Sequence, residues 1–155
     1  MTYRITGLAP EPFADLRGAE EAALAAAGAR RVIAQSKPGY PCRISLEDAE
    51  VGERLILLHH VSHDVDTPYR SAYAIYLREN AGAAAVYEDA LPPVMEGRPI
   101  AMRGFDEAGM LLDAALALPG EADAAIRRLF YNRDIAYIDA HNAAHGCFAA
   151  RVERA

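Results

Sequence analysis

Alternation of apolar and polar residues with a period of two is the feature that most limits how this chain can fold. Segments with this pattern recur along the whole sequence and are separated by Gly, Pro, Asp or Asn, which favour turns. They are TYRIT, RRVIAQ, PCRISL, ERLILLHHV, SAYAIYLRE, RPIAMR, GMLLDAALAL, DIAYIDAH and CFAARVER. Tight turns join antiparallel neighbours, so the pattern predicts a mostly antiparallel β-sheet.

Three segments depart from simple alternation and refine the predicted sheet. LILL, at 55–58, is apolar on both faces and predicts a central strand covered on both sides. FDEAG, at 105–109, predicts a short hairpin loop between two strands. Residues 81–99 are the least regular part of the chain and predict either a mobile loop over the sheet or a plain connector.

Helical spacing occurs in two places. EPFADLRGAEEAALAAAG has apolar residues three or four apart, with Pro12 near its start and Gly28 at its end, and predicts a helix from about Glu11 to Ala27. GEADAAIRRLFYN predicts a second helix with Ile126 and Leu129 on its apolar face. The expected fold is therefore α+β, with two main helices packed on the sheet, in one globular domain over residues 1–155.

Charge and composition narrow the classes of ligand and location. The formal net charge is −6, which argues against a nucleic-acid partner because phosphate binding needs clustered cations. Lys37 is the only lysine, so an anion would be held by arginine. The N-terminus has no signal-peptide pattern, and no run reaches the ~18 apolar residues of a membrane span. We expect a cytoplasmic protein, with no membrane partner and with free Cys42 and Cys147.

The segment DAHNAAHGCFA, at 139–149, concentrates residues that can carry chemistry. If residues 142–146 form a hairpin loop, His141 and Cys147 are the closing cross-strand pair, and Asp139 shares their face. A thiol beside an imidazole that a carboxylate orients is a nucleophile with its base. This interpretation assigns Cys147 as nucleophile, His141 as base and Asp139 as orienting group.

Two other interpretations of this segment stay open. In the first, it is only a hairpin end, with Cys147 buried as a small apolar residue and His141 bound to the loop backbone. In the second, His141, His145 and Cys147 are zinc ligands, with Cys42 or His63 as a fourth. The spacing lacks a second local ligand pair, so we assign no metal and no cofactor.

Further polar residues are candidates for ligand binding. Arg43, in GYPCRISL, can bind a carboxylate or phosphate through two parallel hydrogen bonds. His63, Tyr69 and Arg70 lie at the turn around Pro68, where a side chain can reach a ligand at the edge of the sheet. The neighbours His59 and His60 point to opposite faces of a strand and cannot share one metal ion. Glycine-rich phosphate loops, nucleophile elbows, Cys-x-x-Cys pairs and zincin helices do not occur.

The segments GYPCRISLEDAEVGERLILL, DTPYRSAYAIYLRE and DAHNAAHGCFAARVERA resemble an uncharacterised bacterial family, domain of unknown function 1203. The resemblance spans nearly the whole chain. Its most specific parts are 40–43, 68–71 and 141–148. It implies a full-length single domain and no particular activity. It also selects the residues to test: Arg43, His63, Arg70, His141, Asn142 and Cys147.

Three functions remain compatible with the sequence. The leading hypothesis is one polar pocket, formed by the C-terminal hairpin and the Pro41 and Pro68 bends, that binds a small anionic molecule. The residues proposed to bind this molecule are Arg43, Arg70, His141 and Asn142. The second is a thiol enzyme with Cys147 as nucleophile. The third is an interaction module without catalysis, in which a homo-oligomer is possible and an exposed apolar patch is expected.

Overall fold

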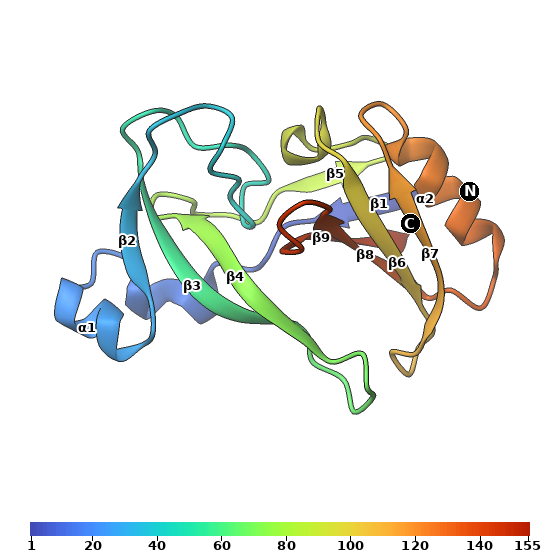
Figure 1. Cartoon of the computed structure of the whole chain (residues 1–155), viewed down its shortest axis with the longest axis horizontal. Helices are drawn as coiled ribbons and strands as arrows, with labels where there is room; N and C mark the ends of the chain where they lie inside the picture. The colour runs from blue at the N-terminus through green and yellow to red at the C-terminus, as the bar shows by residue number, and fades with distance from the viewer.

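The strands of this protein form two separate antiparallel sheets. The computed structural model describes all residues, 1–155, and Figure 1 shows the two sheets side by side. The larger sheet has six strands in the order β5-β1-β9-β8-β6-β7, and the smaller has three in the order β2-β3-β4. The bounds are β1 Tyr3–Thr6, β2 Arg30–Ile33, β3 Arg54–His63, β4 Ser71–Arg78, β5 Val86–Glu88, β6 Ile100–Phe105, β7 Leu111–Ala117, β8 Tyr137–Asn142 and β9 Phe148–Arg154. All pairings between these strands are antiparallel, as the alternation predicts.

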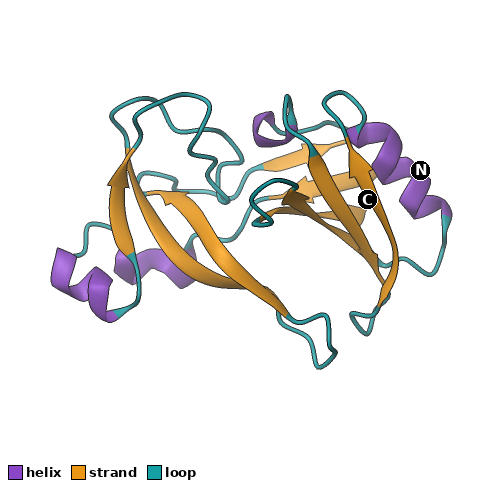
Figure 2. Cartoon of the chain, viewed as in Figure 1, coloured by secondary structure: helices purple, strands orange, loops and turns teal.

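The larger sheet has one face in a hydrophobic core. The helix α2, Ala122–Tyr131, covers this face (Figure 2). There Ile126 and Leu129 pack with Ile138 and Ala140 of β8. The second predicted helix is therefore confirmed. Since alternate residues of a strand point to opposite faces, Tyr137, Asp139 and His141 lie on the other face. A contact between His63 of β3 and the Tyr137 hydroxyl shows that this face meets the smaller sheet.

The smaller sheet has its own core, and here the first helix prediction is wrong. Residues 11–27 form a 3-10 helix, Glu11–Leu16 (η1), and a short α-helix, Glu21–Ala26 (α1), instead of one continuous helix. The break comes at Gly18, whose φ of 64° lies in the left-handed region. The two pieces still bury Phe13 and Leu24 beside Ile56 and Ile75 of the sheet, so the apolar spacing predicts burial correctly and continuity wrongly.

Of three predictions about single segments, two are confirmed and one is wrong. LILL belongs to β3, the middle strand of the smaller sheet. FDEAG includes the β6–β7 turn, where the Asp106 carboxylate accepts hydrogen bonds from the N–H groups of Ala108 and Met110. PCRISL is not a strand: it forms turns with isolated bridges from Pro41 and Cys42. Within the irregular 81–99 segment lie β5 and a 3-10 helix, Pro93–Met95 (η2).

The turns after Pro41 lie between the two sheets. The carbonyl of Arg43 accepts a hydrogen bond from the N–H of Leu8, at 2.7 Å, and the Ile44 carbonyl accepts one from Ala85, at 2.9 Å. Gly7 passes so close that a Cβ atom there would lie 2.0 Å from the Ile44 carbonyl oxygen. This junction holds Arg43 between the two sheets. No helix in the structure is both long and apolar enough to cross a bilayer.

Candidate functional site

A bulge in the β8–β9 hairpin decides which residue Cys147 meets. Asp139 pairs with Arg151 and Ala140 with Ala150, but the register then shifts and His141 pairs with Phe148. The N–H of Asn142 donates to the Cys147 carbonyl at 2.9 Å, so Asn142 is its cross-strand neighbour. The predicted closing pair of His141 and Cys147 is therefore wrong. The pairing of Asp139 with Arg151 would by itself put Ala149 opposite His141, and the extra residue on β9 moves this partner only to Phe148.

The Cys147 side chain contacts an arginine and an amide. An N–H of the Arg43 guanidinium (Nη2) lies 3.0 Å from the Cys147 Sγ, and Asn142 Nδ2 donates to the same sulfur at 3.4 Å. Arg43 and Cys147 are 104 residues apart in the sequence. The remaining Arg43 bonds go to main-chain carbonyls: Nε donates to Phe148 at 2.7 Å, and Nη1 donates to Pro41.

Arg43 is a buried cation without a carboxylate partner. Its side chain is only 2% exposed, and none of the ion pairs of the protein includes it. Burial lowers the pKa of Arg43 from its ordinary value, and the Cys147 sulfur opposes that shift. Buried charges are ordinarily paired, since the loss of hydration is otherwise uncompensated.

Arg43, Asn142 and Cys147 line a cavity of about 400 Å³ between the two sheets, here called the Arg43 cavity. Its other walls come from the turn around Pro41, from β3 and β4, from the segment before β6 and from the hairpin loop. They are Gly39, Pro41, Leu57, Tyr73, Ala74, Tyr76, Arg98, Pro99, Ala143, Ala144 and His145. Arg98 is neutralised here because it makes two hydrogen bonds to Asp48, at 2.9 and 2.6 Å. Arg43 is thus the one arginine of this cavity whose charge no carboxylate balances.

Asn142 adds a buried acceptor to the cavity. It is 7% exposed, and its Oδ1 atom has no hydrogen-bond partner in the protein. Buried acceptors are ordinarily satisfied, and each exception calls for an explanation such as a missing ligand or water. The cavity is therefore lined both by a positive residue and by a residue whose buried acceptor has no partner.

His141 lies on the other side of the hairpin, in a different network. Its Nδ1 contacts the Asp139 carbonyl at 3.2 Å, and Arg103 Nη1 lies 3.5 Å from its Nε2. Burial, followed by the charge of Arg103, lowers the pKa of His141 to about 4. The imidazole is therefore neutral at pH 7, and with Nδ1 as donor its Nε2 is directed at Arg103.

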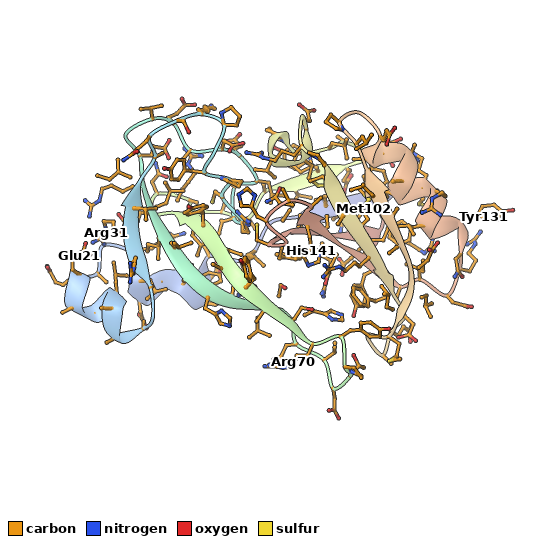
Figure 3. The ribbon with its side chains drawn as sticks, in the orientation of Figure 1. Glu21, Arg31, Arg70, Met102, Tyr131 and His141 are labelled. Carbon is orange, nitrogen blue, oxygen red and sulfur yellow. The ribbon has the colours of Figure 1, made fainter.

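Arg70 lines a cavity of about 320 Å³ with His141 and Arg103, here called the His141 cavity. Figure 3 shows His141 near the centre of the molecule and Arg70 at the base of the β3–β4 loop. Arg70 is exposed and forms an ion pair with Asp64 at 2.9 Å. Tyr73 lines both cavities. The single pocket expected from the sequence is therefore divided in two by the hairpin end.

The remaining predicted site residues make contacts within the fold. Asp139 is fully buried and accepts two hydrogen bonds from Arg151, at 2.7 and 3.0 Å, so its carboxylate orients that arginine and not His141. His63 Nδ1 contacts the Tyr69 carbonyl at 2.9 Å, and its Nε2 lies 2.8 Å from the Tyr137 hydroxyl. No group of three or more His, Cys, Asp and Glu side chains is arranged to hold a metal ion. The zinc ligands considered from the sequence therefore do not form a metal site in the structure.

Sequence reasoning missed several residues of the site. Tyr76 and Arg98 line the Arg43 cavity, and Arg103 contacts His141. Tyr76 and Arg103 lie inside regular strands, where an alternating polar or aromatic residue is indistinguishable from a solvated one. The two residues reach the cavities only because of how their strands pair within the two sheets, which the sequence alone does not show.

One family model matches this chain, over residues 39–154, and its description is "Protein of unknown function (DUF1203)". The match includes both the Arg43 turn and the hairpin that carries Asn142 and Cys147. No curated protein and no solved structure matches the chain.

Proposed function

The chain belongs to the DUF1203 family, and we propose that it binds a small anionic ligand in the Arg43 cavity. The observation that carries the proposal is the buried Arg43 guanidinium, which has carbonyl oxygens and a thiol as neighbours but no carboxylate. An anion would provide the missing counter-charge. Guanidinium groups bind carboxylates and phosphates through charge-assisted hydrogen bonds.

The hydrogen-bonding capacity of Arg43 supports this role. A guanidinium has five N–H groups, and the protein uses three of them in the bonds to Phe148, Pro41 and Cys147. Two N–H groups remain for a ligand, one on Nη1 and one on Nη2, and one carboxylate can accept a hydrogen bond from each of them. The three protein bonds hold the guanidinium in place, so a ligand would meet a donor that is already oriented.

The cavity wall favours an anion with an apolar part. Leu57, Tyr73 and Pro99 provide apolar surface around the polar groups, and ligand sites commonly combine such walls with a few polar anchors. The free acceptor of Asn142 suits a ligand that also carries a hydroxyl or N–H donor. Small organic acids of this kind fit better than a bare inorganic ion.

A thiol enzyme with His141 as the base of Cys147 receives less support. The hydrogen-bonding neighbours of the Cys147 sulfur are Arg43 and Asn142, whereas His141 contacts Arg103 and the Asp139 carbonyl. The low pKa of His141 also makes it a weak proton acceptor at neutral pH. We therefore do not assign His141 and Asp139 a catalytic role.

The test is ligand-induced stabilisation with defined probes. Sodium acetate, lactate, benzoate and phosphate are added at matched ionic strength, and the thermal midpoint is measured. A probe at a hundred times its Kd adds about 2.7 kcal/mol to the free energy of unfolding and raises Tm by about 5–10 °C. Calorimetric titration of the best probe then gives its Kd.

Three variants connect any binding to the cavity. Arg43→Gln should abolish the stabilisation, because it removes the cation. Ala143→Leu should also abolish it by filling the cavity without removing Arg43, so it serves if Arg43→Gln does not fold. Arg70→Gln is the matched control, since this exposed arginine lines the other cavity and should leave binding unchanged. The proposal is wrong if no probe stabilises the protein, or if Ala143→Leu binds as well as wild type.

A further inference from the structure

We propose that Cys147 is an oxidisable thiol that takes an oxygen atom from an organic hydroperoxide bound in the Arg43 cavity. This activity uses the same cavity as the proposed anion site but does not depend on anion binding. Its essential groups are the Cys147 sulfur, the Arg43 guanidinium and the Asn142 side chain.

The surroundings of the sulfur suit a nucleophile. The Arg43 Nη2 atom at 3.0 Å and the Asn142 Nδ2 atom at 3.4 Å both direct N–H groups at Sγ. Donors and positive charge beside a cysteine stabilise the negative sulfur that attacks an electrophile. Arg43 is held by two carbonyl oxygens as well, so this arrangement exists before any substrate binds.

The free acceptor on Asn142 is the second observation, and it points to a ligand with a hydrogen-bond donor. The Oδ1 atom is buried and has no partner, while the Nδ2 atom of the same amide contacts the sulfur. A hydroperoxide has one O–H group, on its terminal oxygen. Donation of that O–H to Asn142 Oδ1 would place the terminal oxygen beside Sγ, where attack takes place.

The shape and lining of the cavity favour an organic hydroperoxide over hydrogen peroxide. A volume of about 400 Å³ is many times that of one peroxide molecule, and apolar wall comes from Leu57, Tyr73 and Pro99. An alkyl or aryl group would fill this space and gain from leaving water. The two N–H groups of Arg43 that the protein does not use can donate hydrogen bonds to the inner oxygen.

The proposed step balances in atoms and electrons. The thiolate attacks the terminal oxygen, an S–O bond forms, the O–O bond breaks, and its electron pair leaves with the inner oxygen as an alkoxide. The alkoxide, stabilised by Arg43, takes up the proton that the thiol lost on ionisation. Cysteine is thereby oxidised to sulfenic acid, and the hydroperoxide is reduced to an alcohol.

Cys42 provides an internal control in the same molecule. It is fully buried, and its sulfur accepts hydrogen bonds from the N–H groups of Ile44, Ser45 and Arg78, at 3.3–3.5 Å. It does not line the Arg43 cavity. Cys42 is therefore expected to stay reduced under conditions that oxidise Cys147.

The experiment treats the full chain with cumene hydroperoxide and traps sulfenic acid with dimedone. Peptide mass mapping assigns the label, and chromatography measures the cumyl alcohol produced. We expect rapid labelling of Cys147, one alcohol per Cys147, no label on Cys42, and a slower reaction with hydrogen peroxide. Asn142→Ala should slow the reaction by about tenfold or more, because it removes a bond to the charged sulfur and the acceptor for the substrate.

Two more variants guard against effects on folding. Asn142→Asp keeps the size of the side chain but places a negative charge beside the sulfur, so it should slow oxidation as much as Asn142→Ala. Arg70→Gln should react like wild type. The proposal is overturned if Cys147 reacts no faster than free cysteine, if Cys42 is labelled equally, or if folded Asn142 variants react at the wild-type rate.

The two proposals for this cavity can fail separately. Binding of an organic acid without hydroperoxide-dependent labelling would remove the thiol activity and leave the anion site. Rapid labelling that depends on Asn142, with no stabilisation by any acid, would do the reverse. If both hold, a saturating acid should protect Cys147 from cumene hydroperoxide, since the two ligands compete for Arg43.

Discussion

The buried His141 is predicted to make the stability of the protein depend on pH between about 6.5 and 4. Its pKa falls from 6.5 to about 4 in the folded state, through burial and then through Arg103. Within this interval the unfolded chain binds a proton that the folded chain excludes. The free energy of unfolding therefore decreases as the pH falls through this interval, and the contribution is fully present above about pH 6.5.

The size of the effect follows from the two pKa values. Each pKa unit is equivalent to about 1.4 kcal/mol, so the interval from 6.5 to about 4 is worth about 3 kcal/mol. His141 is 3% exposed, so solvent screens this penalty little. Among the groups around it, Arg103 and His63 oppose protonation, whereas Asp139 favours it without reversing the direction.

The assay is urea unfolding of the wild type and of His141→Gln at several pH values from about 7 to about 4. Glutamine does not titrate in this range, so the variant should lose about 3 kcal/mol less than the wild type over the interval. Arg103→Met should show an intermediate loss, because His141 then accepts a proton more readily. His59→Gln, at an exposed histidine, is the control and should follow the wild type.

Parallel curves for wild type and His141→Gln would refute the reasoning. They would mean that the folded protein protonates His141 as easily as the unfolded chain does. If Arg103→Met also followed the wild-type curve, the charge of Arg103 would have no effect on the protonation of His141.

Three further substitutions, one of them with a matched control, test the packing that positions the site. Gly7→Ala should unfold or strongly destabilise the protein, because its Cβ would lie 2.0 Å from a main-chain oxygen, whereas Gly82→Ala, with open space around it, should change unfolding by no more than about 0.5 kcal/mol. Cys42→Ala should cost about 1–3 kcal/mol in urea unfolding, since buried N–H groups lose the sulfur as acceptor. Arg151→Met should cost about 3 kcal/mol at pH 7, because it leaves the buried Asp139 carboxylate without its partner. An equal loss for Arg151→Met in a background that already carries Asp139→Asn would show that packing, and not charge, is responsible.

Local patterns predicted most of the secondary structure. Alternation identified β1, β2, β3, β4, β6, β7, β8 and β9, because side-chain direction in a strand is a local property. It failed at PCRISL, where the Cys42 sulfur and a left-handed Leu46, with φ of 54°, turn the chain. Helical spacing failed at Gly18, where the apolar pattern continues although the helix does not. In both places the backbone conformation of one or two residues prevents a continuous strand or helix, although the pattern of apolar residues continues.

The candidate site could be predicted only in part. Arg43, Asn142 and Cys147 were identified by residue type, and the structure brings all three together. His141 was assigned to the same group, because the expected hairpin register placed it opposite Cys147. In the structure Asp139 pairs with Arg151, and an extra residue in β9 then puts Phe148 opposite His141, so the hairpin register differs from the expected one and with it the partner of each side chain.

The sequence by itself determined that this chain forms antiparallel strands, and that several of its candidate site residues lie in the last hairpin. These properties depend on neighbours along the chain or on composition. The tertiary structure decided that there are two sheets, that the hairpin end separates two cavities, and that Arg43 contacts a sulfur 104 residues away. Such contacts follow from the register of strands and from the position of a turn between sheets, and no local pattern encodes which distant polar groups will meet.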